Sequence, residues 1–219
     1  MDRIEFRDRI VLTTLPHAAF DGWSMRALRA GVADAGLSPE TALLLFPGGI
    51  RDVVRHWSSY GDRRMLEEME KLDGASMRVR DRIAAAVRFR FEVNLTHREA
   101  VRRGLSFLAM PQNADLAARC AFDTVTAMWY AAGDTSADYN YYTKRALLAA
   151  VLSATVLYWL DDESEDYGDT WSFLDRRIDD VMKIPKLLSR LTDAIERLAP
   201  PLSPFGHRAG RGFRARGPI

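Results

Sequence analysis

The sequence predicts an all-α protein, and two observations support this prediction. Apolar residues return at intervals of three and four in successive segments, which is the period of an amphipathic helix. No segment stands out by the two-residue alternation of a strand, and no internal repeat of fixed period stands out. With 219 residues, 47% hydrophobic and 28% charged, the composition is ordinary for a globular protein. This length suits one helical domain with a real core, or a small domain beside a larger one.

The first 60 residues predict a helix-turn-helix-like region of short helices. Ser24 and Ser38 are placed to cap the second and third helices, Gly36 to end the second, and Pro39 to occupy the first position of the third. The expected helices cover residues 3–17, 25–35, 39–45 and 50–60. This layout is similar to the N-terminal domain of TetR regulators, so DNA binding has to be considered.

The short third helix argues against DNA binding. Residues 39–45 include no Lys, Arg, Asn or Gln that could contact a base edge or a phosphate, and Glu40 would face a polyanion. The formal net charge of the chain is +1, which implies no general affinity for nucleic acid or acidic membranes. We therefore expect no nucleic acid partner.

The remainder of the chain is also expected to be helical. Thr96 and Glu99 have the spacing of a capping box, Asn113 is placed to cap the helix after it, and Gly133 to end that helix. An acidic loop over 161–169 is expected to be solvated. The expected helices cover residues 63–71, 77–94, 96–110, 114–132, 138–160 and 170–183. The helix expected over 77–94 carries several arginines, which are expected on a solvated face. They are Arg78, Arg80, Arg82, Arg88 and Arg90.

The sequence lacks the patterns of a catalyst, so we expect no enzyme activity, no cofactor and no metal. The four histidines are far apart in sequence, and no E-x-x-H, H-E-x-x-H, P-loop or G-x-S-x-G occurs. Cys120 is the only cysteine and lies among apolar residues, which favours a buried thiol over a nucleophile.

The stretch 129–145 joins two apolar helical segments and is rich in polar and aromatic residues. Asp138, Tyr141, Tyr142 and Arg145 follow one another at the three-and-four spacing that places side chains on one face of a helix. Two interpretations stay open at this point. The stretch is either a capped turn with a solvated first helical turn, or a binding surface.

Residues 133–183, GDTSADYNYYTKR through RRIDDVMK, resemble the signature segment of a ubiquinone-biosynthesis accessory family, the ninth coenzyme Q protein. The resemblance implies a TetR-like helical fold that binds an isoprenoid lipid or ubiquinone precursor, and a homodimer formed through C-terminal helices. It also implies a partner, the demethoxyubiquinone hydroxylase, contacted through Asp138, Tyr141, Tyr142 and Arg145. The chain departs from the family at Tyr141-Tyr142, where the family usually has Trp-Tyr.

A lipid-binding protein of this family needs helices that are apolar on more than one face, so that a cavity can form between them. The residues expected to contact the lipid are Leu105, Leu108, Phe122, Val125, Met128, Trp129, Leu148, Val151, Leu152 and Thr155. These residues could equally form a solid core, because a cavity wall and a packed core have the same composition. The assignment to lipid binding therefore rests on the resemblance.

Residues 184–198 predict an amphipathic helix that could lie in a membrane interface. Its apolar stripe includes Leu187, Leu188, Leu191, Ile195 and Leu198, and an arginine-rich tail without acids follows. Packing on the domain or on a dimer partner is the alternative. The uncharged run 146–160 is about 22 Å long as a helix, short of a bilayer, and is expected to be a buried helix.

These observations predict a helix-turn-helix-like region over 1–60, a lipid-binding and dimerisation domain over 61–183, and a membrane-associating helix with a basic tail over 184–219. The acidic residues near the start argue against a presequence, so a cytoplasmic protein, peripheral to the inner membrane and bacterial rather than mitochondrial, is expected. A TetR-type regulator with a small-molecule effector pocket, and an interaction scaffold with a solid core, remain alternatives.

Overall fold

A computed structural model describes residues 2–74, 76–134 and 139–181 of the chain. The described part is built from α1 (Arg3–Asp21), α2 (Met25–Asp34), α3 (Pro39–Leu45), α4 (Ile50–Glu70), α5 (Val79–Glu92), α6 (Arg98–Leu108), α7 (Ala114–Ala131), α8 (Tyr139–Asp161) and a helix over 168–181. Short 3-10 turns, Leu95–His97, Pro111–Asn113 and Glu165–Tyr167, join some of them. No strand occurs in these ranges, so the predicted all-α fold is confirmed. The expected helix over 184–198 and the basic tail lie outside the described residues, as does Asp138.

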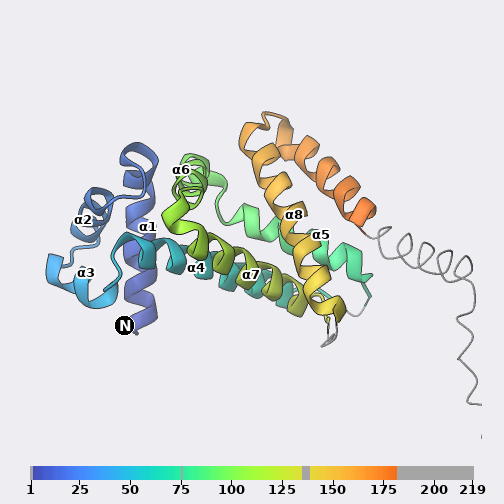
Figure 1. Ribbon diagram of the computed structural model, residues 1–219, viewed down its shortest axis with the longest axis horizontal. Helices are drawn as coiled ribbons and strands as arrows, with labels where there is room; N and C mark the ends of the chain where they lie inside the picture. Colours follow the sequence, from blue (N-terminus) through green and yellow to red (C-terminus); the bar gives the residue numbers. More distant parts are fainter. Residues whose placement is uncertain (1, 75, 135–138, 182–219) are drawn as a thin grey trace, which may run out of the picture. The chain divides into compact units, whose positions relative to one another are not determined.

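The N-terminal helices follow the predicted layout, with α1, α2 and α3 gathered at one end of the described part (Figure 1). Ser24 accepts a hydrogen bond from the backbone N–H of Ala27, as a cap should. Gly36 adopts a positive φ of 68° directly after α2, which is the conformation that ends the helix. Local sequence therefore sets the boundaries of this region.

Helix α4 is one continuous helix, although two were expected over 50–60 and 63–71. It crosses residue 60, where the boundary between the first two regions was predicted. Gly61, in its middle, lies against the guanidinium of Arg90 from α5. A Cβ at Gly61 would come within 2.5 Å of the Arg90 Cζ. Close approach of another helix, and not an interruption of α4, explains this glycine.

Three predicted caps, Ser38, Thr96 and Asn113, make no side-chain cap hydrogen bond. Thr96 lies in a 3-10 turn, α6 begins at Arg98 without a side-chain cap, and Glu99 pairs with Arg103 at 3.0 Å instead. Asn113 precedes α7 but makes no cap hydrogen bond. Its amide donates to the carbonyl of Phe107 at 2.8 Å and its Oδ1 accepts from Arg51 at 2.7 Å. A partner distant along the chain, Arg51, therefore engages Asn113, whereas Glu99 is paired within its own helix.

The acidic loop is built around one buried carboxylate, so its expected solvation is wrong at Asp162. Asp162 accepts hydrogen bonds from the backbone N–H groups of Ser164 at 2.8 Å and Thr170 at 2.9 Å. Arg98 of α6 donates to the carbonyls of Trp159 at 2.6 Å and Asp162 at 2.9 Å, near the end of α8. Carbonyls at a helix C-terminus lack partners within the helix, and an arginine supplies them here.

The pKa of Asp162 is lowered from 3.8 to about 2. Burial raises this pKa, but the combined hydrogen bonds from Ser164 and Thr170 outweigh it because they favour the carboxylate. The folded pKa lies below the unfolded one, so the contribution to stability is complete above pH 4 and is lost as the pH falls toward 2.

Replacing Asp162 with Ala should lower the free energy of unfolding at pH 7 by about 1–2 kcal/mol, the usual cost of losing a cap. The difference between wild type and variant should shrink between pH 4 and pH 2. Thermal and urea unfolding measure both. Asp161→Ala is the control, because the exposed pair of Asp161 with Arg102 contributes about 0–1 kcal/mol. An equal loss of unfolding free energy in the two variants would contradict the capping role of Asp162.

Helix α8 buries one side and exposes the other. Leu148, Val151, Thr155 and Trp159 are buried, while Leu157 is exposed. The expectation of a buried helix therefore holds for one side only. Over Tyr141–Asp161 the helix is long and apolar enough to cross a membrane by length and composition, with a mean hydropathy of 1.2 and 33% of the residues buried. This is weak evidence for a span, because core helices of soluble proteins pass the same test.

Candidate functional site

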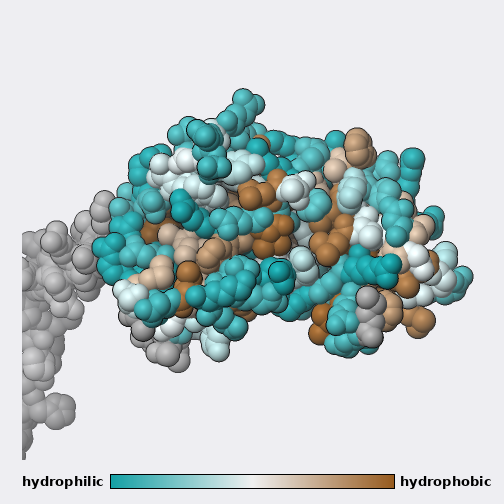
Figure 2. Space-filling model, turned by 180° about the vertical axis from the view of Figure 1, so that it is seen from behind, coloured by the Kyte–Doolittle hydropathy of each residue, from teal (hydrophilic) through white to brown (hydrophobic). Residues whose placement is uncertain are grey.

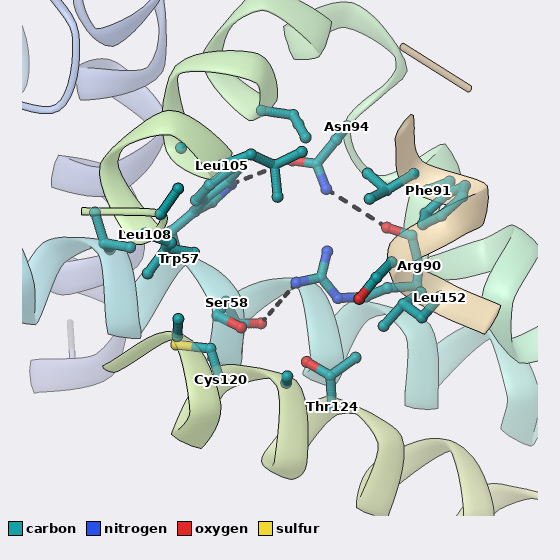
Figure 3. Close-up of a pocket in the computed structure, with 18 of the residues that line it drawn as sticks. Trp57, Ser58, Arg90, Phe91, Asn94, Leu105, Leu108, Cys120, Thr124 and Leu152 are labelled. Atoms are coloured by element: carbon teal, nitrogen blue, oxygen red, sulfur yellow. Dashed lines mark hydrogen bonds between the residues drawn. The ribbon is translucent and has the colours of Figure 1, made fainter. Parts of the chain in front are cut away.

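A cavity of about 400 Å³ lies among α4, α5, α6, α7 and α8 (Figure 3). Small-molecule sites are typically of about 300–1,000 Å³ with mostly apolar walls and a few polar groups, and this cavity fits that description. Its apolar wall is formed by Val54, Trp57, Phe91, Val101, Leu105, Leu108, Leu152, Val156 and Trp159. The helices therefore line a partly open space that a solid core would not have.

Two stacked tryptophans hold one wall of the cavity in place. The Trp57 ring stacks on Trp23 with centroids 4.7 Å apart, and its Nε1–H donates to Asn94 Oδ1 at 3.1 Å. Trp23 donates in turn to the carbonyl of Ala100 at 3.0 Å. A Cβ on Gly104 would lie 2.8 Å from the Trp57 ring, so glycine is needed for α6 to approach. Through these contacts Trp23, which lies between α1 and α2, helps to position the cavity wall.

The cavity also has a polar end. Arg90 Nε donates to Asp62 Oδ1 at 2.9 Å, and the Thr124 hydroxyl donates to the same oxygen at 2.8 Å. Arg90 Nη2 reaches the carbonyl of Ser58 at 3.3 Å. Because Asp62 is buried, the ion pair compensates two charges that would each be costly alone. Arg90 was expected on a solvated face, and that expectation is wrong.

Cys120 lies at the cavity wall and is buried. Burial raises the pKa of its thiol, since the thiolate would lose hydration, and the carboxylates of Asp62 and Asp123 raise it further. The neutral thiol is therefore favoured, and the predicted burial of Cys120 is confirmed. It contributes apolar surface to the wall and has none of the features of an activated nucleophile.

Cys120 should react with a maleimide at pH 7.5 at least about tenfold more slowly in the folded protein than after unfolding in urea, because the thiolate is disfavoured and covered. The rate in the folded protein should rise with pH later than it does in the unfolded chain. Mass spectrometry at timed intervals measures this. A folded rate equal to the unfolded one would show that the thiol is accessible and ordinary.

The structure separates the residues expected to contact lipid. Leu105, Leu108 and Leu152 line the cavity. Six others are buried elsewhere in the helical core: Val125, Met128, Trp129, Leu148, Val151 and Thr155. Phe122 is 41% exposed and does not line the cavity. The sequence offered a signal for Arg90, which falls on the apolar stripe of α5 begun by Ile83 and Val87. It offered none for Trp57 or Asn94.

The predicted partner patch divides into exposed and buried residues. Tyr142 is 68% exposed and Tyr141 is half-buried, with their rings edge to face at 5.0 Å. Arg145 is only 6% exposed, and its guanidinium lies 3.3 Å from the centre of the Tyr141 ring. It donates to Thr126 Oγ1 and to the Tyr141 carbonyl, both at 3.1 Å. Arg145 therefore supports Tyr141 from below, and the tyrosines form the surface.

Helix α3 presents apolar side chains to solvent, with Leu43 64% and Leu44 76% exposed. Its acidic residue, Glu40, is also exposed. Among the described residues no group of three His, Cys, Asp or Glu could hold a metal ion. Figure 2 shows hydrophobic residues gathered in the middle of one face, surrounded by hydrophilic ones.

Comparisons with known proteins agree on one family. Residues 114–185 match the COQ9 family model. "Ubiquinone biosynthesis protein COQ9, mitochondrial" from Rattus norvegicus is 34% identical over 187 residues, which are 82% of this chain and 60% of that protein. The Homo sapiens protein of the same name is 33% identical over 186 residues, 82% of this chain and 58% of that protein. The predicted family resemblance is confirmed.

A solved structure confirms the TetR-like fold. A TetR transcriptional regulator from Nitrosomonas europaea superposes with a TM-score of 0.65, over 80% of this chain and 97% of that one. Its sequence is 22% identical, so the likeness concerns the fold alone. DNA binding by that regulator carries no implication for this chain.

The expected localisation is wrong. The relatives from rat, human, Drosophila melanogaster and Dictyostelium discoideum are all named as mitochondrial, against the expectation of a cytoplasmic, bacterial protein. That expectation depended on the acidic residues at the start of the sequence. Because the chain spans less than two thirds of the length of the rat and human relatives, its first residues do not bear on a presequence.

Proposed function

This chain carries the COQ9 family match over residues 114–185, and from this premise we propose a non-catalytic accessory role in ubiquinone biosynthesis. The chain binds an isoprenoid lipid, a ubiquinone precursor, in the cavity among α4 to α8. It presents this lipid to the demethoxyubiquinone hydroxylase, working as a homodimer at a membrane surface. The proposed membrane contact is made by the apolar stripe of 184–198, which lies outside the described residues.

The observation that carries this proposal is the cavity. Its volume of about 400 Å³ and its largely apolar wall suit the chain of a lipid and would be an unexplained loss of packing in a scaffold. We assign the lipid contact to the residues that line it, Leu105, Leu108 and Leu152 among them. The absence of catalysis is part of the proposal and is supported by the neutral thiol of Cys120.

The alternative, a regulator with an effector pocket, would use the same cavity. The surface of α3 favours the lipid protein, because the helix in the recognition position exposes Leu43 and Leu44 and carries no basic residue. DNA-binding helices contact bases and phosphates through polar and basic side chains. We therefore propose that the chain does not bind nucleic acid.

Filling the cavity should remove lipid binding. Ala121 lines the cavity, whereas Ala118 on the same helix is exposed and does not line it. Ala121→Phe should lower the uptake of a prenylated quinone at least about tenfold, since the ring takes up space that the ligand needs and overpacking costs about 1–3 kcal/mol. Ala118→Phe should bind as wild type does. Native mass spectrometry of the purified full-length chain with added ligand measures uptake.

Two results would count against the lipid proposal. Binding of equal strength in wild type and Ala121→Phe would place the lipid outside this cavity. Sequence-dependent, nanomolar binding of duplex DNA near physiological salt would favour the regulator. Circular dichroism of each variant shows whether the fold is kept.

We propose that the hydroxylase docks on the aromatic surface formed by Tyr141 and Tyr142. An exposed aromatic ring contributes little to folding but can anchor an interface. Arg145 is proposed to act by holding Tyr141 in place, because its guanidinium packs on that ring and is buried. The role of Asp138, which lies outside the described residues, stays a prediction.

Tyr142→Ala should weaken binding to the hydroxylase by about 2 kcal/mol or more, with a change of under about 0.5 kcal/mol in folding stability. The control is Phe20→Ala, which removes an exposed ring on α1 and should leave both unchanged. Co-purification, thermal melting and lipid content are measured together. A sharp loss of stability and of lipid in Tyr142→Ala would show a core or cavity residue and would reject the docking surface.

A further inference from the structure

The polar end of the cavity has a donor that the protein does not use. Two guanidinium nitrogens of Arg90 are occupied, Nε by Asp62 and Nη2 by the carbonyl of Ser58. The third, Nη1, has no hydrogen bond within the described residues, and Figure 3 shows the Arg90 side chain reaching into the cavity between Ser58 and Asn94. An acceptor on a ligand in the cavity would complete the hydrogen bonds of this guanidinium.

Asn94 offers a second donor beside it. Its Oδ1 is occupied by Trp57 at 3.1 Å, but its Nδ2 reaches the Arg90 carbonyl only at 3.5 Å, which is long for a hydrogen bond. Arg90 and Asn94 thus present donors at one end of a largely apolar space, whose lining also includes Ser58, Thr124 and Ser153. The arrangement suits a ligand that is polar at one end and apolar along the rest.

The charge at this end decides which kind of head fits. Arg90 is the only charged residue of the described wall, and its charge is balanced by Asp62, which is buried directly behind it. A negatively charged head would approach the Asp62 carboxylate and would lose hydration without a free counter-charge. An uncharged oxygen, such as a carbonyl, accepts from Arg90 without this cost.

We propose that the cavity recognises an amphiphile whose head is an uncharged carbonyl-type acceptor, with Arg90 Nη1 as the donor that selects it. This inference rests on the proposed function, because it presumes that the cavity holds a lipid. It adds that Arg90 recognises the polar head group of the lipid and that charged head groups are excluded. The apolar tail extends along the wall formed by Leu105, Leu108 and Leu152.

The experiment compares three ligands on the full-length chain. They share an isoprenoid tail of equal length and end in a benzoquinone, in a carboxylate, or in no polar group. Arg90→Lys keeps the positive charge beside Asp62 but loses the planar fork that supplies Nη1. Arg88→Lys is the matched control, because Arg88 is exposed on the same helix and does not line the cavity.

Wild type should bind the quinone at least about tenfold more tightly than either other ligand, equal to about 1.4 kcal/mol. Arg90→Lys should bind the quinone about tenfold more weakly than wild type does, and should bind the ligand without a polar group as tightly as wild type does. Arg88→Lys should bind all three ligands as wild type does. The ligand comparison on wild type keeps the test valid even if Arg90→Lys unfolds.

The two proposals fail in different ways. If wild type binds none of the three ligands, the lipid-binding function fails, and this inference fails with it. If quinone and hydrocarbon bind wild type equally, or Arg90→Lys folds and keeps its preference, the cavity holds lipid but Arg90 does not select the head. Tightest binding of the carboxylate would overturn the uncharged head and leave lipid binding in place.

Discussion

The ion pair between Asp62 and Arg90 joins the helices that enclose the cavity. Asp62 comes from α4 and Arg90 from α5, and Thr124 of α7 donates to the same carboxylate. Removing Arg90 would leave the buried Asp62 carboxylate without compensation, which typically costs about 3–5 kcal/mol. The packing of α4 against α5 depends on Gly61, where a side chain would occupy the position of the guanidinium. The polar end of the cavity is therefore also what fixes three of its walls.

The remaining walls are attached at two further points. Trp57 stacks on Trp23 and bonds to Asn94, which ties the end of α5 to the N-terminal helices. Arg98 and Arg102 of α6 donate to the last carbonyls of α8, so that α8, a largely apolar helix, is held at its end by charged groups from α6. A cavity lowers the stability of the fold, because the residues that line it lose packing contacts. The polar contacts at its border hold the helices in place, so that the cavity stays open although its walls are apolar.

The TetR-like fold is common to this chain and to a transcriptional regulator, and the side chains on its surface distinguish this chain. The helix at the recognition position exposes leucines, and the aromatic surface of Tyr141 and Tyr142 lies on α8, in the segment that matches the COQ9 family. A fold accommodates unrelated functions because sites are made by surface and cavity residues. The structural similarity to a regulator therefore identifies the architecture, whereas the function has to be inferred from the residues of the site.

The sequence by itself determined most of the helices, because helix period and local caps such as Ser24 and Gly36 act within a few residues. It also determined the family, through the segment after Gly133. It did not determine that α4 is a single helix.

Tertiary structure decided everything that depends on partners distant in sequence. Asn113 was predicted as a cap, yet its Oδ1 accepts a hydrogen bond from Arg51 of α4 instead. Arg90 is half-buried beside Asp62, and Arg145 is buried beside Asp134 and the Tyr141 ring, and no local pattern reveals such partners. Whether leucines line a cavity or fill a core is likewise decided only by how helices meet, since both environments select the same apolar residues.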